Sequence, residues 1–206
     1  MKIKWSREEL PTIASLINAG AVGCLPTDTL YGLVGSALNG NAVSRVYRIK
    51  GRDPNKPLIV LFKSPEQLGE LGVKVPKALE KGIKALYPAP VTLVLPLSES
   101  SPFRSIFKRD DLAVRVPNSP LLLELLELTG PLFAPSANPQ GLKPAENCRE
   151  CLKYFKNAVD FCAEGRAGNV ASTIVKVLPE GELKLLREGA VEFEKVKEVL
   201  LGKEKA

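Results

Sequence analysis

The sequence predicts a single α/β domain in which helices flank a twisted mixed sheet. Two observations predict this fold class: short apolar runs alternate with helical patterns along the chain, and turn residues separate them. The chain has 206 residues, 45% hydrophobic and 25% charged, which is the composition of a globular domain with its own core. We therefore expect one domain over residues 1–206 with a largely buried sheet.

Local signals justify each element in the first half of the chain. Residues 6–9 (SREE) form a capping box before apolar residues at helical spacing, and Gly20 ends that helix. Asn41 caps the next helix, which ends at Lys50-Gly51-Arg52, and the prolines that follow cannot continue it. The remaining predictions are strands at 21–25, 58–62 and 91–97, helices at 65–71 and 76–86, and a polar surface loop at 98–104.

The second half is predicted in the same way. Residues 112–117 (LAVRVP) form a strand with one charge among apolar residues, and Pro120 opens a leucine-rich helix that Gly130 ends. The remaining predictions are a strand at 132–135, a helix at 145–155, strands at 172–178 and 183–187, and a final helix at 191–201.

Composition excludes several classes of protein. No run approaches the roughly 18 apolar residues that span a bilayer, and the N-terminus lacks the apolar region of a signal peptide, so a cytoplasmic location is expected. The chain has no histidine, which excludes a Ser-His-Asp triad and a histidine-ligated zinc. Its net charge of +6 suits an anionic ligand, either a nucleotide or RNA.

Three features at the ends of predicted elements are candidate binding residues. Lys50 and Arg52 suit the oxygens of a polyphosphate, although a basic solvated helix face is the alternative. Ser136 and Asn138 offer a hydroxyl and an amide in a loop bounded by prolines. The turn around Thr29 carries hydroxyls that could orient a small polar ligand or form an ordinary turn. The chain contains neither of the two common glycine-rich phosphate loops.

The four cysteines include a C-x-x-C pair, Cys148 and Cys151, which the predicted helix places one turn apart. No second pair follows at the spacing of a zinc finger. We expect ordinary thiols first, then a disulfide to Cys162, and a redox or metal site last.

Five blocks in order resemble the YrdC family: residues 26–33 (PTDTLYGL), 50–52 (KGR), 87–94 (YPAPVTLV), 112–117 (LAVRVP) and 135–138 (PSAN). The resemblance covers residues 20–187. It implies a concave, positively charged groove and an ATP-dependent nucleotidyltransferase. The implied reaction joins L-threonine, bicarbonate and ATP into L-threonylcarbamoyladenylate (threonylcarbamoyl-AMP) and releases pyrophosphate. A threonylcarbamoyl transferase that modifies tRNA would use the product.

The resemblance also assigns functions to individual residues. The family's K-x-R and S-x-N signature implies that four residues are catalytic and bind ATP: Lys50, Arg52, Ser136 and Asn138. Further implied ATP contacts are Lys56 and Arg187, and implied threonine contacts are Thr29, Tyr31, Arg115 and Ser172. Mg²⁺ is expected on the phosphates, with no metal bound by the protein itself. Leu61 stands where some longer relatives have a histidine, and the extra C-terminal domain of those relatives is expected to be absent.

Two alternatives remain open at this stage. The basic composition also fits an RNA-binding module of the same fold without synthase activity, whose affinity would fall steeply with salt. A paralogue that adenylates another carbamoyl compound is the second. Charge neutralisation and placement carry the implied chemistry in either enzyme, because the chain has no histidine base.

Overall fold

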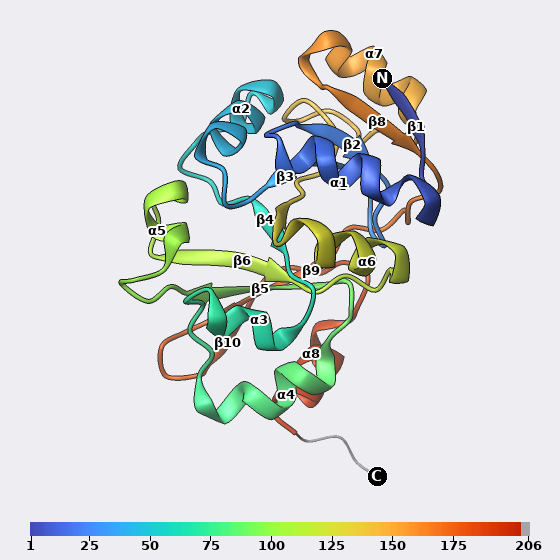
Figure 1. Ribbon diagram of the computed structural model, residues 1–206. Helices are drawn as coiled ribbons and strands as arrows, with labels where there is room; N and C mark the ends of the chain where they lie inside the picture. The colour runs from blue at the N-terminus through green and yellow to red at the C-terminus, as the bar shows by residue number, and fades with distance from the viewer. Residues whose placement is uncertain (203–206) are drawn as a thin grey trace.

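The computed structural model describes residues 1–202 and consists of one ten-stranded mixed sheet with helices on both faces (Figure 1). The strand order is β1-β8-β2-β3-β7-β4-β6-β5-β9-β10. The strands are β1 (Lys2–Lys4), β2 (Gly23–Leu25), β3 (Gly32–Ser36), β4 (Ile59–Leu61), β5 (Val91–Pro96), β6 (Asp111–Arg115), β7 (Leu132–Phe133), β8 (Phe161–Glu164), β9 (Thr173–Val177) and β10 (Leu183–Arg187). The predicted single α/β fold with a mixed sheet is confirmed.

Four of the nine strand pairings are parallel, β1 with β8, β8 with β2, β4 with β6 and β5 with β9, and the others are antiparallel. β2 and β7 are buried at every residue, and β3, β4, β5, β6 and β8 at all but one, as expected of a sheet covered on both faces. β10 is the half-exposed strand at one edge, and its partner β9 alternates buried and intermediate residues.

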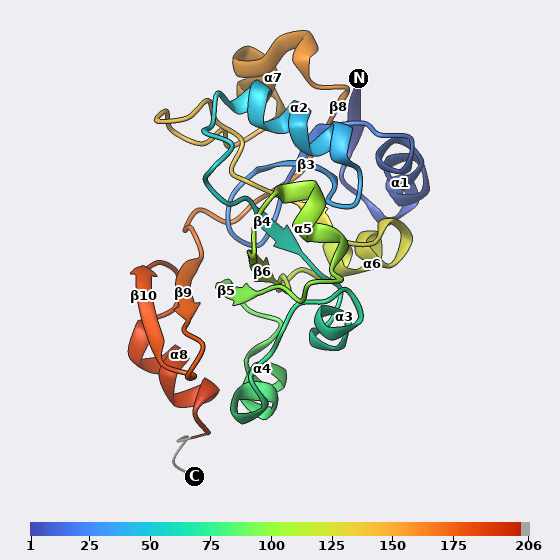
Figure 2. The same cartoon turned by 90° about the vertical axis from the view of Figure 1, so that its left-hand side faces the viewer.

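Helices cover the sheet on two faces and create two separate hydrophobic cores (Figures 1 and 2). The helices are α1 (Leu10–Asn18), α2 (Gly40–Lys50), α3 (Pro65–Glu70), α4 (Glu80–Leu86), α5 (Pro102–Phe107), α6 (Pro120–Thr129), α7 (Cys148–Phe155) and α8 (Phe193–Leu200). α1 and α6 enclose the smaller core, and the others contribute to the larger one. Neighbouring residues of a strand alternate between the two, since Cys24 belongs to the larger core and Leu25 to the smaller.

Several predicted boundaries are wrong in ways that have a local cause. Ser6 makes no capping hydrogen bond with its side chain; residues 7–9 form a 3-10 turn, and α1 begins at Leu10. The predicted polar loop at 98–104 instead leads into helix α5. Ser101 caps that helix by accepting a hydrogen bond from the Phe103 amide, and Phe103 is fully buried against Phe62.

Three strands were not predicted, β1, β3 and β8. Each is three to five residues long and lacks a run of β-branched residues. Pairing with distant segments stabilises them, because β8 lies between β1 and β2 and accepts partners on both sides. The sequence therefore predicted the central strands better than this end of the sheet.

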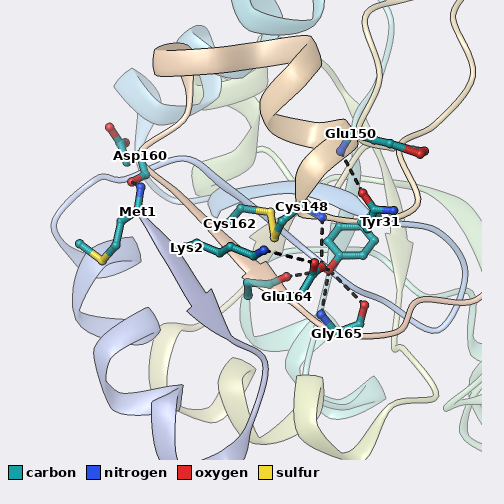
Figure 3. The surroundings of a disulfide bond; sticks show 11 residues. Met1, Lys2, Tyr31, Cys148, Glu150, Asp160, Cys162, Glu164 and Gly165 are labelled. Carbon is teal, nitrogen blue, oxygen red and sulfur yellow. Dashed lines mark hydrogen bonds and ion pairs between the residues drawn. A yellow bond between two sulfur atoms is a disulfide. The ribbon is translucent and has the colours of Figure 1, made fainter.

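The first expectation for the cysteines is wrong for two of them, because Cys148 and Cys162 form a disulfide that joins α7 to β8 (Figure 3). The second expectation, a disulfide to Cys162, is confirmed for Cys148. Cys24 and Cys151 are free and buried beside it. α7 begins at Cys148 rather than at residue 145, and it still places Cys148 and Cys151 one turn apart.

Among the described residues, we find no helix that is both long and apolar enough to cross a membrane.

The contact between α4 and α8 yields a prediction about stability. A Cβ at Gly82 would lie 2.1 Å from the backbone oxygen of Leu200, so Gly82→Ala should lower the free energy of unfolding by about 1–3 kcal/mol. Gly69 is the matched control, since its Cβ would meet open space and helix α3 should gain up to about 1 kcal/mol from Gly69→Ala. Denaturant unfolding of both variants measures the difference; equal stabilities would contradict this packing.

Candidate functional site

Helix α2 ends at two cations, Lys50 as its last residue and Arg52 just beyond it. Asn39, rather than the predicted Asn41, caps the helix, since its side chain accepts a hydrogen bond of 3.0 Å from the Ala42 amide. At the other end Gly51 adopts the left-handed conformation with φ of 65°. This glycine ends the helix in one residue, so that Lys50 is the last helical residue and Arg52 leaves in a new direction.

The Lys50 ammonium holds the turn at residues 136–138. It donates to the Ser136 carbonyl at 2.8 Å, the Asn138 carbonyl at 2.9 Å and the Asn138 Oδ1 at 3.0 Å. Asn138 in turn donates to the carbonyls of Pro139 and Leu142, and its Oδ1 also accepts from the Ser136 hydroxyl. An ammonium has three N–H donors, and Lys50 donates all three to this turn.

Arg52 is held at two of its three nitrogens. Its terminal nitrogens donate to the Gln140 side chain at 3.1 Å and to the Pro57 carbonyl at 2.9 Å. The Nε atom is buried and has no partner. A buried donor without an acceptor costs folding free energy, because it has lost its hydrogen bonds to water. An acceptor on a bound ligand would remove this cost.

These residues line a cavity of about 190 Å³, the larger compartment of the site. Lys50, Arg52 and Arg187 provide its cations, and Ser136 provides a hydroxyl. The rest of its wall is apolar and comprises Pro57, Leu58, Ile59, Val94, Ala113, Pro135, Ile174 and Leu186. The combination of cations on one side and aliphatic groups on the other suits a ligand with both an anionic and a flat apolar part.

A second, smaller compartment of about 60 Å³ adjoins it, since Ile59, Ser136 and Arg187 line both. The smaller compartment is lined by Thr29, Leu30, Tyr31, Ile59, Arg115, Ala134, Ser136, Ala171, Ser172 and Arg187. It is more polar than the first, and five of its residues carry a hydroxyl or a guanidinium besides Tyr31.

Arg115 is the central cation of the smaller compartment. Its side chain is 2% exposed and forms a close ion pair with Asp28, and it donates to the Thr29 hydroxyl at 3.2 Å. Its Nε is buried without a partner, like that of Arg52. Asp28 also accepts from the Asn118 amide at 2.8 Å, which fixes the carboxylate on the turn that precedes Thr29.

Ser172 and Arg187 also line the smaller compartment. Ser172 shares a hydrogen bond of 2.8 Å with Thr92, whose hydroxyl lies in the otherwise apolar strand β5. Arg187 donates twice to the Ser172 carbonyl, at 3.1 and 2.9 Å. The β9–β10 pairing is irregular between Leu185 and Arg187, and a bulge of this kind redirects a side chain.

Two glycines let backbone segments approach the site closely. A Cβ at Gly168 would lie 2.3 Å from the carbonyl oxygen of Asp28, and one at Gly189 would lie 2.3 Å from that of Ala171. Both carbonyls belong to segments that carry site residues. Any larger residue at these two positions would clash with the two segments and displace them.

Four cations line the two compartments: Lys50, Arg52, Arg115 and Arg187. Among the residues that the structure describes, no carboxylate lines either compartment. Burial and then the Arg52 charge lower the pKa of Lys50 to about 8, although its three carbonyl acceptors favour the charged form. Burial likewise lowers the pKa of Arg52, and burial and the Arg115 charge lower that of Arg187. A bound anion would relieve all of these effects.

Eight of the ten residues proposed from the sequence line one or both compartments, all except Asn138 and Lys56. Asn138 lines neither compartment and accepts two hydrogen bonds from Lys50. Tyr31 lines the smaller compartment, but its hydroxyl points away, donates to the Ala163 carbonyl at 2.7 Å and accepts from the Gly165 amide. Lys56 is exposed and lines neither compartment. Leu61 is buried in the smaller core and lines neither compartment as well.

Sequence reasoning left several site residues without a function, above all Asp28, Thr92 and the aliphatic wall. A signal existed for the first two. Asp28 directly precedes Thr29 in the turn that the sequence predicts to be a binding feature, and Thr92 is the one polar residue of strand β5. The residues form an ordinary turn, in which Thr27 accepts from the amides of Thr29 and Leu30, and Thr29 also lines the smaller compartment.

The fold and the site define an α/β domain with one two-compartment site, cationic on one side and small and polar on the other. A profile of the family Sua5_yciO_yrdC, described as telomere recombination, matches residues 15–189. The chain belongs to this family, which confirms the resemblance seen in the sequence.

Named relatives agree with this assignment. The chain is 37% identical over 191 residues to a threonylcarbamoyl-AMP synthase of Pyrococcus abyssi, covering 91% of this chain and 56% of that protein. It is 34% identical to a threonylcarbamoyl-AMP synthase of Halorhodospira halophila, covering 76% of this chain and 83% of that one. The crystal structure of P. abyssi Sua5 complexed with L-threonine superposes with a TM-score of 0.86 at 34% identity. That superposition covers 97% of this chain and 60% of the Sua5 chain, so the chain spans little more than half of its longer relatives.

The buried ion pair yields a second prediction. Asp28→Ala leaves the Arg115 charge buried beside a hydroxyl only, which should lower the free energy of unfolding by about 3–5 kcal/mol. Asp111→Ala is the matched control, because its pair with Arg109 is partly exposed and should cost no more than about 1 kcal/mol. Thermal and denaturant unfolding measure both, and a cost for Asp28→Ala no greater than that of the control would contradict the result.

Lys50 yields a third prediction, on pH. Its pKa is about 8 in the folded protein against 10.5 in the unfolded chain, so between these values the unfolded state binds more protons. The free energy of unfolding should therefore rise between about pH 8 and pH 10.5, by roughly 3 kcal/mol at most. Below pH 8 Lys50 is charged in both states, so the folded protein carries the full cost of burying that charge. Subtracting the pH profile of Lys50→Met isolates this contribution from those of tyrosines and cysteines. Parallel profiles for the two proteins would rule it out.

Proposed function

We propose that the protein is a nucleotidyltransferase that makes threonylcarbamoyl-AMP from L-threonine, bicarbonate and ATP and releases pyrophosphate. The observation that carries the proposal is the pair of adjoining compartments, each with a buried arginine Nε that lacks an acceptor. Two anionic groups, one in each compartment, would satisfy both atoms. The synthases among the relatives and the L-threonine of the P. abyssi structure are consistent with this reading.

The larger compartment suits ATP. Its aliphatic wall would accept the adenine, and Arg52 and Arg187 would face the phosphates. Lys50 has a different function from the one that its charge alone suggests. Because its three protons are already used on the 136–138 turn, it would position Ser136 and Asn138 and add positive charge, rather than grip an oxygen directly.

The smaller compartment suits the amino acid. Arg115 would bind the α-carboxylate, and the hydroxyls of Thr29 and Ser172 would orient the polar side chain. Asp28 would keep the Arg115 guanidinium fixed before the substrate arrives, which lowers the entropic cost of binding. Ser136 lies on the boundary, between the two reacting molecules.

The reaction would then depend on placement. Threonine's amine, once joined to bicarbonate with loss of water, carries a carbamate whose oxygen attacks the α-phosphorus of ATP. The bond from the α-phosphorus to pyrophosphate breaks, and the pyrophosphate leaves with its electron pair. Both reactants are held at the shared wall, so the attack becomes an intramolecular step, and the surrounding cations stabilise the charge that develops on the leaving group.

Mg²⁺ fits this site as the partner of the nucleotide. Magnesium prefers oxygen ligands and commonly bridges substrate phosphates. The described lining of the larger compartment offers it the Ser136 hydroxyl and no carboxylate, so the phosphates would hold the ion. Its chemistry would be to neutralise charge on them.

The test is pyrophosphate release from ATP with each substrate left out in turn. We expect release to require both L-threonine and bicarbonate, with threonylcarbamoyl-AMP detected by mass spectrometry. In parallel assays, serine replaces threonine, or carbamoyl phosphate replaces bicarbonate. Pyrophosphate release that is faster with either replacement would indicate a paralogue that adenylates another carbamoyl compound. ATP turnover that ignores threonine would overturn the proposal.

Two variants test the residues. Arg52→Ala should lower kcat/KM by about 10²–10³-fold, the usual loss for a donor to a developing negative charge. Arg48→Ala, in the last turn of α2 and lining neither compartment, should change it little. A similar loss in both variants would assign the effect to general electrostatics instead.

A further inference from the structure

All four cysteines of the sequence lie in one buried cluster on the side of the sheet opposite α1 and α6. The sulfurs of Cys24, Cys151 and Cys162 lie within 4.8 Å of one another, and that of Cys148 is bonded to that of Cys162. All four residues are fully buried. Neither the disulfide nor the proposed function explains why two further thiols are placed beside it.

The backbone fixes this arrangement independently of the disulfide. Cys24 of β2 and Cys162 of β8 are register partners across a parallel pair. Cys148 and Cys151 are the first and fourth residues of α7, so their side chains share one face of its first turn. The N-terminus of a helix favours negative charge, and thiolates are stabilised there.

We propose that the cluster, once its disulfide is reduced, binds one zinc-class divalent ion through the four sulfurs of Cys24, Cys148, Cys151 and Cys162. Four thiolates are the ligand set of a closed structural zinc site. Zinc–sulfur bonds of about 2.3 Å place tetrahedral sulfurs about 3.8 Å apart, so the three nearby sulfurs need to close by no more than about 1 Å. The two bonded sulfurs must separate instead, which reduction permits.

The chemistry balances with a dithiol reductant. The reductant supplies two electrons and two protons, which convert the Cys148–Cys162 bond into two thiols while the reductant becomes a disulfide. The ion then displaces the protons of the four thiols. A hydrogen bond to Cys151 and then burial raise the pKa of the Cys24 thiol.

The two states would connect different elements. The disulfide joins α7 to β8 only, whereas the ion would also connect β2, which ends two residues before Thr27 and the turn of the smaller compartment. Figure 3 shows a further link on the disulfide side: Glu164 accepts from the Cys148 amide at 3.1 Å and from the Tyr31 hydroxyl at 3.2 Å. The proposal does not depend on the proposed enzymatic function.

The test uses Co²⁺, which reports thiolate ligands by its visible absorption. The full chain is reduced with a dithiol without oxygen, the reductant is removed, and a thiol titration in denaturant confirms four free thiols. We expect one Co²⁺ per chain, with the sulfur-to-cobalt charge-transfer band and the d–d bands of a tetrahedral site, and displacement by Zn²⁺. Zn²⁺ should also raise the melting temperature of the reduced protein.

Controls distinguish the cluster from adventitious binding. The oxidised protein keeps two thiols and should lose the tetrathiolate spectrum. Cys24→Ser should lose part of the charge-transfer intensity and the gain in melting temperature, and Cys151→Ser, from a different element, should do the same if Cys24→Ser folds poorly. Absence of the bands in protein with four titrated thiols would overturn the proposal. An unchanged spectrum in a folded Cys24→Ser variant would also overturn it.

Discussion

The organisation of the site depends on one buried ammonium. Lys50 is 3% exposed, and its charge can remain in the interior only because three oxygens of the 136–138 turn surround it. This contact joins the end of α2 to the segment that follows β7, two parts of the chain separated by 86 residues. It thereby fixes Ser136, which lines both compartments together with Ile59 and Arg187.

The same region contains more positive charge than it needs for folding. Asp28 compensates Arg115, but Lys50, Arg52 and Arg187 are held by neutral oxygens. Neutral partners hold a cation in place without cancelling its charge, so the field remains available to a ligand. Burial lowers the pKa of Lys50, so keeping this charge in the interior costs folding free energy. Perturbed titratable groups and like charges that face one another are typical of functional sites.

The sequence predicted the core of the fold and most of the site, and the reasons for its failures are physical. Strands such as β4 and β5 were predicted because their residues are apolar over the whole run, whatever their partners are. β1 and β8 owe their existence to pairing across about 160 residues, which no local pattern encodes. Lys50, Arg52, Ser136 and Arg115 could be found because charged and polar groups at the ends of strands are conspicuous. The functions of Asp28 and of the Lys50 hydrogen bonds depend on side-chain geometry and could not be read from spacing.

The position of β8 between β1 and β2 has a consequence for biosynthesis. The two strands at the start of the chain cannot be joined in the sheet until residue 164 has left the ribosome, because the strand that separates them is made late. Until then their unpaired edges and the apolar face of α1 remain exposed, a state that is prone to aggregation. Cys24 likewise waits for Cys148, Cys151 and Cys162, so the sulfur cluster is assembled only after most of the chain has been translated. Its chemistry therefore belongs to the finished protein and cannot guide the early steps of folding.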